Sequence, residues 1–561
     1  MGSARSSYEF HSRIESFSSF CRREWKSIAA FGGGFVVVMI AAVLLIDPAF
    51  FYPRLQTDPL NYWLKAKSLV ENGTTSARWA VNIRPFAYAA MPGVIRAPLL
   101  MLFNGFDAQL RAIQIVNIPI VALVALFSAY IFSWSLPQSR HWLATGFAFV
   151  FTLFNPVWVA NVFLPLVDAP YALFTLICIV LSVRLFAAPV TRSRGLLIAA
   201  YVLCLAIAFP MRFTAPLVLV FALTLILGRS DGSLTRHRRI IGLGAVAIIL
   251  LAFLVVLNAD AIFGRYFKEL SAFVIKGDKL AMFLNVAAAA IPSQIVPTFM
   301  QGFLYVPIYD YFKGDFFGKP MQAAWTIVGL CLTTIAVTGI WRSRARFLPE
   351  ILYLLAGLPI LGLMMPSTSR YLKSYQGFIW IFFFSGAAWI YERNRHRFPS
   401  FMRTRGFAIS AVASLALIVA GIRAWRMIGT ASEKKFAVSV TRAPDYVTDV
   451  ATTFRGLRGF IETLPADRTL LISDPGSMGR WKVISGRDYY YPDSTIAAIA
   501  RSKDVYLVVE CGTMEGCQIW NEWRKSQESR IDKFGAFAYD SVYAISRPRA
   551  RVEVYRIRSI D

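Results

Sequence analysis

The first long apolar run of this chain is followed by Asp58-Pro-Leu-Asn-Tyr62-Trp-Leu-Lys65-Ala66-Lys67. An acid before a proline is typical of the first turn of a helix, where the carboxylate can cap free backbone N–H groups. Tyr62 then lies one turn later, on the same face as Asp58. A carboxylate at the edge of a bilayer segment is costly unless it caps a helix or serves a function. The residues alone leave both interpretations open.

The composition predicts a multi-pass membrane protein with a small soluble domain. Of the 561 residues, 56% are hydrophobic and 16% are charged, whereas soluble domains average about 25% charged. In lipid, apolar runs of about 20 residues must be helical. We therefore predict an α-helical bundle of about eleven spans, near residues 27–46, 109–133, 142–160, 169–186, 195–210, 213–228, 240–258, 321–340, 350–365, 376–391 and 406–425.

The net charge of +26 reflects short basic clusters between the apolar runs, such as Arg22-Arg23 and Arg236-His237-Arg238-Arg239. These clusters fall in alternate loops, which is the pattern of positive loops kept in the cytoplasm. Topology explains the charge better than a nucleic-acid partner does. We expect a bacterial inner-membrane protein whose N-terminus is cytoplasmic and whose C-terminus, after an odd number of spans, is periplasmic.

The chain divides into three predicted parts. Residues 1–26 form a cytoplasmic N-terminal segment, and residues 27–425 form the membrane domain with long external loops near 47–108 and 259–320. Residues 431–561 alternate helical and strand-like segments, which predicts a small α/β domain. Within it, Cys511 and Cys517 could close a small disulfide loop if the domain lies outside the cytoplasm.

Several motifs follow one another along the chain in an order that resembles that of the C-type (GT-C) membrane glycosyltransferases. Within that class, the similarity is to the branch of protein O-mannosyltransferases and lipid A aminoarabinose transferases. The motifs are Asp58, Tyr62 and Ala66 with Gly73, then Arg84-Pro85, Met91-Pro92-Gly93 and Arg96-Ala-Pro98, Asn155-Pro156, Leu166-Val-Asp168-Ala-Pro170, Phe209-Pro-Met-Arg212-Phe-Thr214 and Ser369-Arg370-Tyr371. The resemblance covers about residues 27–400. It implies sugar transfer from a polyprenyl-phosphate donor to a lipid, glycan or protein acceptor among the membrane lipids.

That chemistry gives the residue types a purpose. A base must take the acceptor proton, and cations must stabilise the departing lipid phosphate. We predict Asp58 as the base, with Asp168 as a second catalytic or orienting acid. Asp168 could equally be a helix cap, and Asp47, at the end of the first span, is a rival base. The predicted substrate-binding residues are Tyr62, Lys65, Arg84, Arg212, Arg370, Tyr371 and Lys373.

No His/Cys grouping in the sequence has the spacing of a zinc site. Asp58 and Asp168 could hold a divalent cation, although nothing else indicates one, and no other cofactor is predicted. The alternative function is a secondary transporter or lipid-linked-oligosaccharide flippase. Transporters usually carry ionisable residues near the middle of the bilayer and show internal repeats, and neither feature is evident in the sequence.

Overall fold

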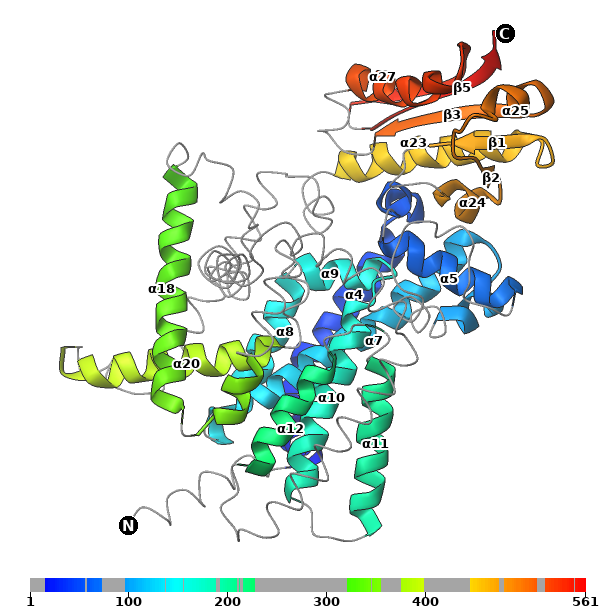
Figure 1. Cartoon of the computed structure of the whole chain (residues 1–561). Helices are drawn as coiled ribbons and strands as arrows, with labels where there is room; N and C mark the ends of the chain where they lie inside the picture. The colour runs from blue at the N-terminus through cyan, green and yellow to red at the C-terminus, as the bar shows by residue number, and fades with distance from the viewer. Residues whose placement is uncertain are drawn as a thin grey trace, which may run out of the picture.

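The computed structural model describes residues 16–55, 58–72, 96–136, 138–154, 156–187, 192–208, 211, 215–227, 320–344, 346–354, 375–397, 444–473, 479–511, 520–548 and 550–560. A bundle of helices makes up the N-terminal part of this structure, and a β-sheet with its own helices lies at one end of the bundle (Figure 1). Two predicted spans, near 240–258 and 406–425, lie outside the described residues, as does most of the span near 350–365.

The described helices follow the predicted spans closely. They are α2 (Phe17–Arg23), α3 (Trp25–Ser27), η1 (Ile28–Gly32), α4 (Gly33–Leu45), α7 (Phe106–Ser133), α8 (His141–Phe154), α9 (Pro156–Phe163), α10 (Asp168–Ala187), α11 (Arg192–Ala208), η4 (Ala215–Leu217), α12 (Val218–Leu227), α18 (Pro320–Ser343) and α20 (Gln376–Asn394). In the described part, three runs are long and apolar enough to cross a membrane: Trp25–Leu45, Phe106–Ser133 and Asp168–Leu185. The predicted helical fold is confirmed, and the count of about eleven spans only in part.

One predicted span differs in the structure. Residues 142–160 were expected to form one helix, but α8 ends at Phe154 and α9 begins at Pro156. Proline lacks a backbone N–H and its ring clashes with the preceding turn, so it suits the first position of a new helix better than the interior of a long one.

Polar side chains of α7 bind the carbonyl groups at the ends of neighbouring helices. Arg111 donates to the carbonyl oxygens of Val43 and Ile46 at the end of α4. Asn117 Nδ2 lies 3.3 Å from the carbonyl oxygens of both Val162 and Leu164 at the end of α9. The last carbonyls of a helix have no partner within it, so these contacts fix the ends of α4 and α9 against the start of α7.

Basic residues lie at the opposite end of the bundle: Arg23 from a predicted cytoplasmic cluster, and Arg346 from the segment after α18. A guanidinium nitrogen of Arg23 lies 2.5 Å from His141 Nδ1, and Arg346 donates to the carbonyl oxygen of Trp134 at 3.1 Å. The structure therefore gathers separate basic segments at one end, as the positive-inside pattern requires. That this end faces the cytoplasm stays a prediction.

Helices α18 and α20 cross at two glycines (Figure 1). A Cβ atom placed on Gly339 would lie 1.8 Å from the carbonyl oxygen of Phe382, and one on Gly386 would lie 1.9 Å from that of Ile335. Small residues permit close backbone approach in membrane bundles. Glycine is therefore required at both positions by the packing of these two helices.

The C-terminal module contains a five-stranded sheet in the order β2-β1-β3-β5-β4. Its strands are β1 (Thr469–Ile472), β2 (Asp488–Tyr489), β3 (Asp504–Cys511), β4 (Phe537–Arg547) and β5 (Ala550–Ser559). The first three are parallel, and β5 pairs antiparallel with β3 and β4. The helices of the module are α23 (Pro444–Thr463), α24 (Arg480–Ser485), α25 (Ile496–Ser502) and α27 (Trp520–Ile531).

The described elements of this module confirm the predicted alternation of helices and strands. Helices α24 and α27 were not predicted, because short or mostly polar segments give little periodic signal. Cys511, at the end of β3, is disulfide-bonded. Cys517, its predicted partner, lies outside the described residues.

Candidate active site

Asp58, the predicted base, begins a helix, as the following Pro59 indicated. Helix α5 runs from Asp58 to Asn72, and Tyr62 on its second turn is 3% exposed. Lys65 also lies on α5, while the side chains of Asp58 and Lys65 are outside what the structure describes. Both the capping role and the catalytic role of Asp58 therefore stay predictions.

Three side chains from separate segments come together at the end of the bundle where α4 and α9 finish. They are Tyr62, Arg96 and Asp168. All three are buried, with exposed fractions of 3%, 3% and 1%. Burial lowers the pKa of the Arg96 guanidinium to about 10, while Tyr62 and Asp168 are close enough to oppose that shift electrostatically. Arg96 is thus still a cation at neutral pH, beside a predicted acid and a predicted substrate-binding tyrosine.

The turn between α9 and α10 shapes this cluster. The Asn161 side-chain oxygen accepts a hydrogen bond from the Ala169 backbone N–H at 3.0 Å, in the first turn of α10. Arg96 donates to the carbonyl oxygen of Leu166 at 2.5 Å, just before that helix. Asp168 therefore lies at the N-terminus of α10, where the helix dipole favours a negative charge, and is close to the buried Arg96 cation.

Arg96 was not among the predicted site residues, although it is part of the Arg-Ala-Pro motif. Nothing in the sequence indicated that α10 would meet it. Five other predicted substrate-binding residues, Arg84, Arg212, Arg370, Tyr371 and Lys373, lie outside the described residues. Their roles stay predictions.

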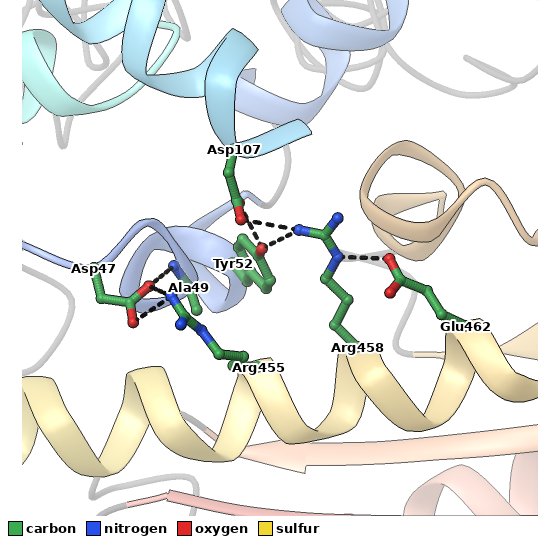
Figure 2. Close-up of polar contacts among 7 residues, drawn as sticks. All are labelled: Asp47, Ala49, Tyr52, Asp107, Arg455, Arg458 and Glu462. Carbon is green, nitrogen blue, oxygen red and sulfur yellow. Dashed lines mark hydrogen bonds and ion pairs between the residues drawn. The ribbon is translucent and has the colours of Figure 1, made fainter. Parts of the chain in front are cut away.

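A second polar cluster joins the C-terminal module to the loop that precedes α5 (Figure 2). The 3-10 helix η2 (Pro48–Arg54) carries the buried Tyr52, whose hydroxyl donates to Asp107 Oδ1 at 2.6 Å. Arg458 of α23 donates to the same hydroxyl at 2.7 Å and to Asp107 Oδ2 at 3.1 Å. Its Nε donates to Glu462 Oε1 at 2.7 Å. This cluster therefore joins η2, the start of α7 and α23.

Asp47 is a helix cap in the structure, consistent with its position at the end of the first span. Its Oδ1 accepts from the Ala49 backbone N–H at 2.9 Å, and its two oxygens lie 2.7 and 2.6 Å from Arg455 Nη2. A carboxylate already engaged by a cap and an ion pair is a weaker candidate for the base than Asp58.

A third contact between the module and this loop is buried. Arg480 of α24 is 1% exposed, pairs with Glu510 of β3 and donates to the carbonyl oxygen of Pro53 at 3.0 Å. The Leu64 side chain of α5 packs near Gly479, immediately before α24. The C-terminal module therefore lies against both η2 and the helix that begins at Asp58.

Comparison with solved structures extends over nearly the whole chain. The crystal structure of ArnT from Cupriavidus metallidurans bound to undecaprenyl phosphate matches 93% of this chain and 98% of that chain, with 12% identity and a TM-score of 0.45. The oligosaccharyltransferase from Archaeoglobus fulgidus, solved with zinc and sulfate, matches 90% of this chain and 72% of that chain, with 12% identity and a TM-score of 0.39. Both are GT-C glycosyltransferases, the class that the sequence motifs resemble.

At 12% identity and with TM-scores below 0.5, these matches assign no activity to this chain. No protein-family model matches the sequence, and no curated protein matches it significantly. Among the described residues, no three His, Cys, Asp or Glu side chains form a group that could hold a metal ion.

Proposed function

We propose that the protein is a membrane glycosyltransferase that moves a sugar from a polyprenyl-phosphate donor to an envelope acceptor on the non-cytoplasmic face. The main support is the convergence of Tyr62, Arg96 and Asp168 beside the helix that begins at Asp58. The order of the sequence motifs supports the same reaction class. Sugar, donor and acceptor are inferences from that class and from the residue chemistry.

In this mechanism Asp58 accepts the proton of an acceptor hydroxyl. The acceptor oxygen attacks the anomeric carbon of the sugar, and the bond from that carbon to the phosphate oxygen breaks. The phosphate oxygen keeps the electron pair and leaves on the polyprenyl chain. Cationic side chains stabilise that developing charge, and Arg84, Arg212, Arg370 and Lys373 are our candidates because arginine and lysine are common phosphate ligands.

The two predicted acids have different roles in the proposal. Asp168 is 1% exposed and close to Arg96, so an acceptor could reach its carboxylate only after rearrangement. We therefore assign Asp168 the orienting role, in which it holds Arg96 beside Tyr62. Asp58, at the start of an external helix, is left as the base.

The position of ionisable residues disfavours the transporter alternative. In the described spans these residues lie near helix ends, as Arg111 does in α7, Arg184 in α10 and Arg342 in α18. A secondary transporter usually places such groups near the bilayer midplane, where they bind the coupling ion.

Replacing Asp58 by Asn tests the proposal. General-base catalysis contributes roughly 10²–10⁴-fold, so glycosylated product should fall by about that factor while membrane insertion stays normal. The measurement is mass spectrometry of envelope lipids, glycans and glycoproteins from cells lacking the gene and complemented with each variant. Asp47→Asn is the matched control, because asparagine still caps η2. Unchanged product in Asp58→Asn would remove Asp58 as the base.

A further inference from the structure

Helix α23 of the C-terminal module presents two arginines, one turn apart, to the first external loop. Arg455 and Arg458 both point from α23 toward η2 in Figure 2. The Arg455 side chain is 63% exposed in its ion pair with Asp47, whereas the Arg458 side chain is 22% exposed. Exposed ion pairs contribute little, so Arg458 is the stronger of the two connections.

Tyr52 makes this connection specific. Its ring packs edge-on against Phe106, and its hydroxyl both donates to Asp107 and accepts from Arg458. Burial, reinforced by Asp107, raises the pKa of Tyr52 above its usual value, which keeps the hydroxyl protonated and able to donate. Burial alone would lower the pKa of Arg458, but the hydrogen bonds with Glu462 and Tyr52 outweigh it and raise that pKa.

The next residue of η2 is held by a different part of the module. Arg480 of α24 donates to the Pro53 carbonyl oxygen from within its ion pair with Glu510. Consecutive residues of η2 are thus fixed by α23 and by α24. Helix α5 begins only a few residues later, at Asp58, and itself contacts α24 through Leu64.

We propose that the C-terminal module positions the candidate active site, and that Arg458, acting on η2 through Tyr52, is the main positioning residue. That the positioned residues form an active site rests on the proposed function. The mechanical coupling between the C-terminal module and η2 does not. Without this contact, η2 and the start of α5 lose a fixed reference to α7, and Asp58 and Tyr62 lose their place relative to Arg96 and Asp168.

Hydrogen exchange of the full-length protein in lipid nanodiscs tests the coupling. In Arg458→Ala and in Tyr52→Phe we expect backbone exchange over residues 48–72 to rise roughly tenfold, as when a hydrogen bond to a charged group is lost. The rise in the double variant should be smaller than the product of the two single rises, because both changes remove the hydrogen bond between Arg458 and Tyr52. Arg458→Lys should largely restore the wild-type rate.

Three outcomes would overturn the coupling: unchanged exchange over 48–72, a faster exchange that spreads through β1, β3 and β5, or an equal rise in Arg455→Ala. The second would show a folding defect of the module, and the third a general charge effect of α23. Wild-type exchange in β1, β3 and β5, together with faster exchange confined to residues 48–72, would support the proposal.

Binding of undecaprenyl phosphate to the same preparations separates this proposal from the proposed function. We expect the wild type and Arg455→Ala to bind it, and Arg458→Ala to bind at least threefold more weakly. A wild type without binding would contradict the polyprenyl-phosphate donor, while the exchange data would still decide the coupling. Equal binding by wild type and Arg458→Ala would contradict the positioning of the site.

Discussion

Arg96 carries a buried positive charge at the point where α5, the helical residues 96–102 and the start of α10 meet. Asp168 is the acid close to it, and the Leu166 carbonyl accepts one of its hydrogen bonds. Taking a guanidinium out of water is costly unless an opposite charge and hydrogen bonds compensate. The pair is therefore expected to be strongly coupled, and removal of either partner should affect the other.

We expect Arg96→Met to destabilise the protein by about 3–5 kcal/mol, because it leaves Asp168 as a buried charge without its cation. Asp168→Asn should cost less, since asparagine can still hydrogen-bond. The double variant should be more stable than the sum of the two single changes predicts. Thermal unfolding of the purified proteins in one detergent provides the comparison. Strict additivity would show that the two side chains do not interact.

The same residues show how far the sequence could predict the site. The Asp-Pro pair and the spacing to Tyr62 predicted a helix that begins at Asp58, and the structure has it. The proximity of Tyr62 to Asp168 could be suspected only through the family resemblance. Arg96 could not be chosen from the several external arginines, because local patterns do not record which long-range turn will bury a given side chain.

At the scale of elements, the crossing of α18 and α20 depends on two glycines. Alanine at Gly339 or Gly386 would place a methyl group against a backbone carbonyl that cannot move aside. Each change should lower the melting temperature and the yield of folded protein, because overpacking of this kind typically costs about 1–3 kcal/mol or more. Gly33→Ala in α4 is the control, since nothing lies within 4 Å of its added Cβ. Equal behaviour of all three variants would contradict the close crossing.

The contact between η2 and α23 should be insensitive to pH over the physiological range. The pKa of Tyr52 is raised in the folded protein, by burial first and then by Asp107. Its contribution to stability is then fully present below the unfolded value of about 10 and is lost as the pH rises toward the higher folded value. The difference in melting temperature between wild type and Tyr52→Phe should therefore be constant from about pH 6 to 9 and shrink above about pH 10. A difference that varies between pH 6 and 9 would point to another titrating group.

Elements were predicted unevenly along the chain, for physical reasons. Long apolar helices such as α7 and α10, and the buried strand β3, have strong periodic or continuous apolar patterns. Helix α27 is mostly polar and gave no such pattern. The contacts of α23 with η2 join residues about 400 positions apart, and no local rule links segments so distant.

At the scale of the whole molecule, the contacts of the C-terminal module place it at the end of the bundle that holds the candidate site. Arg455, Arg458 and Arg480 hold the module against η2 and the start of α7, the same end of the bundle as Tyr62, Arg96 and Asp168. The location of the C-terminus therefore reports the location of the site. The disulfide at Cys511 favours an oxidising compartment, in agreement with the periplasmic side predicted from the basic clusters.

Alkaline phosphatase fused after the last residue tests this topology, because the enzyme is active only where its own disulfides form. We expect an active C-terminal fusion and an inactive fusion at the N-terminus, as an odd number of spans requires. Trapping of thiols in intact cells should agree, with Cys511 oxidised and Cys21, which is a free thiol, reduced. An inactive C-terminal fusion would place the module in the cytoplasm. It would move Asp58 and the Tyr62–Arg96–Asp168 cluster there as well, and an external glycosyl transfer by these residues would then be excluded.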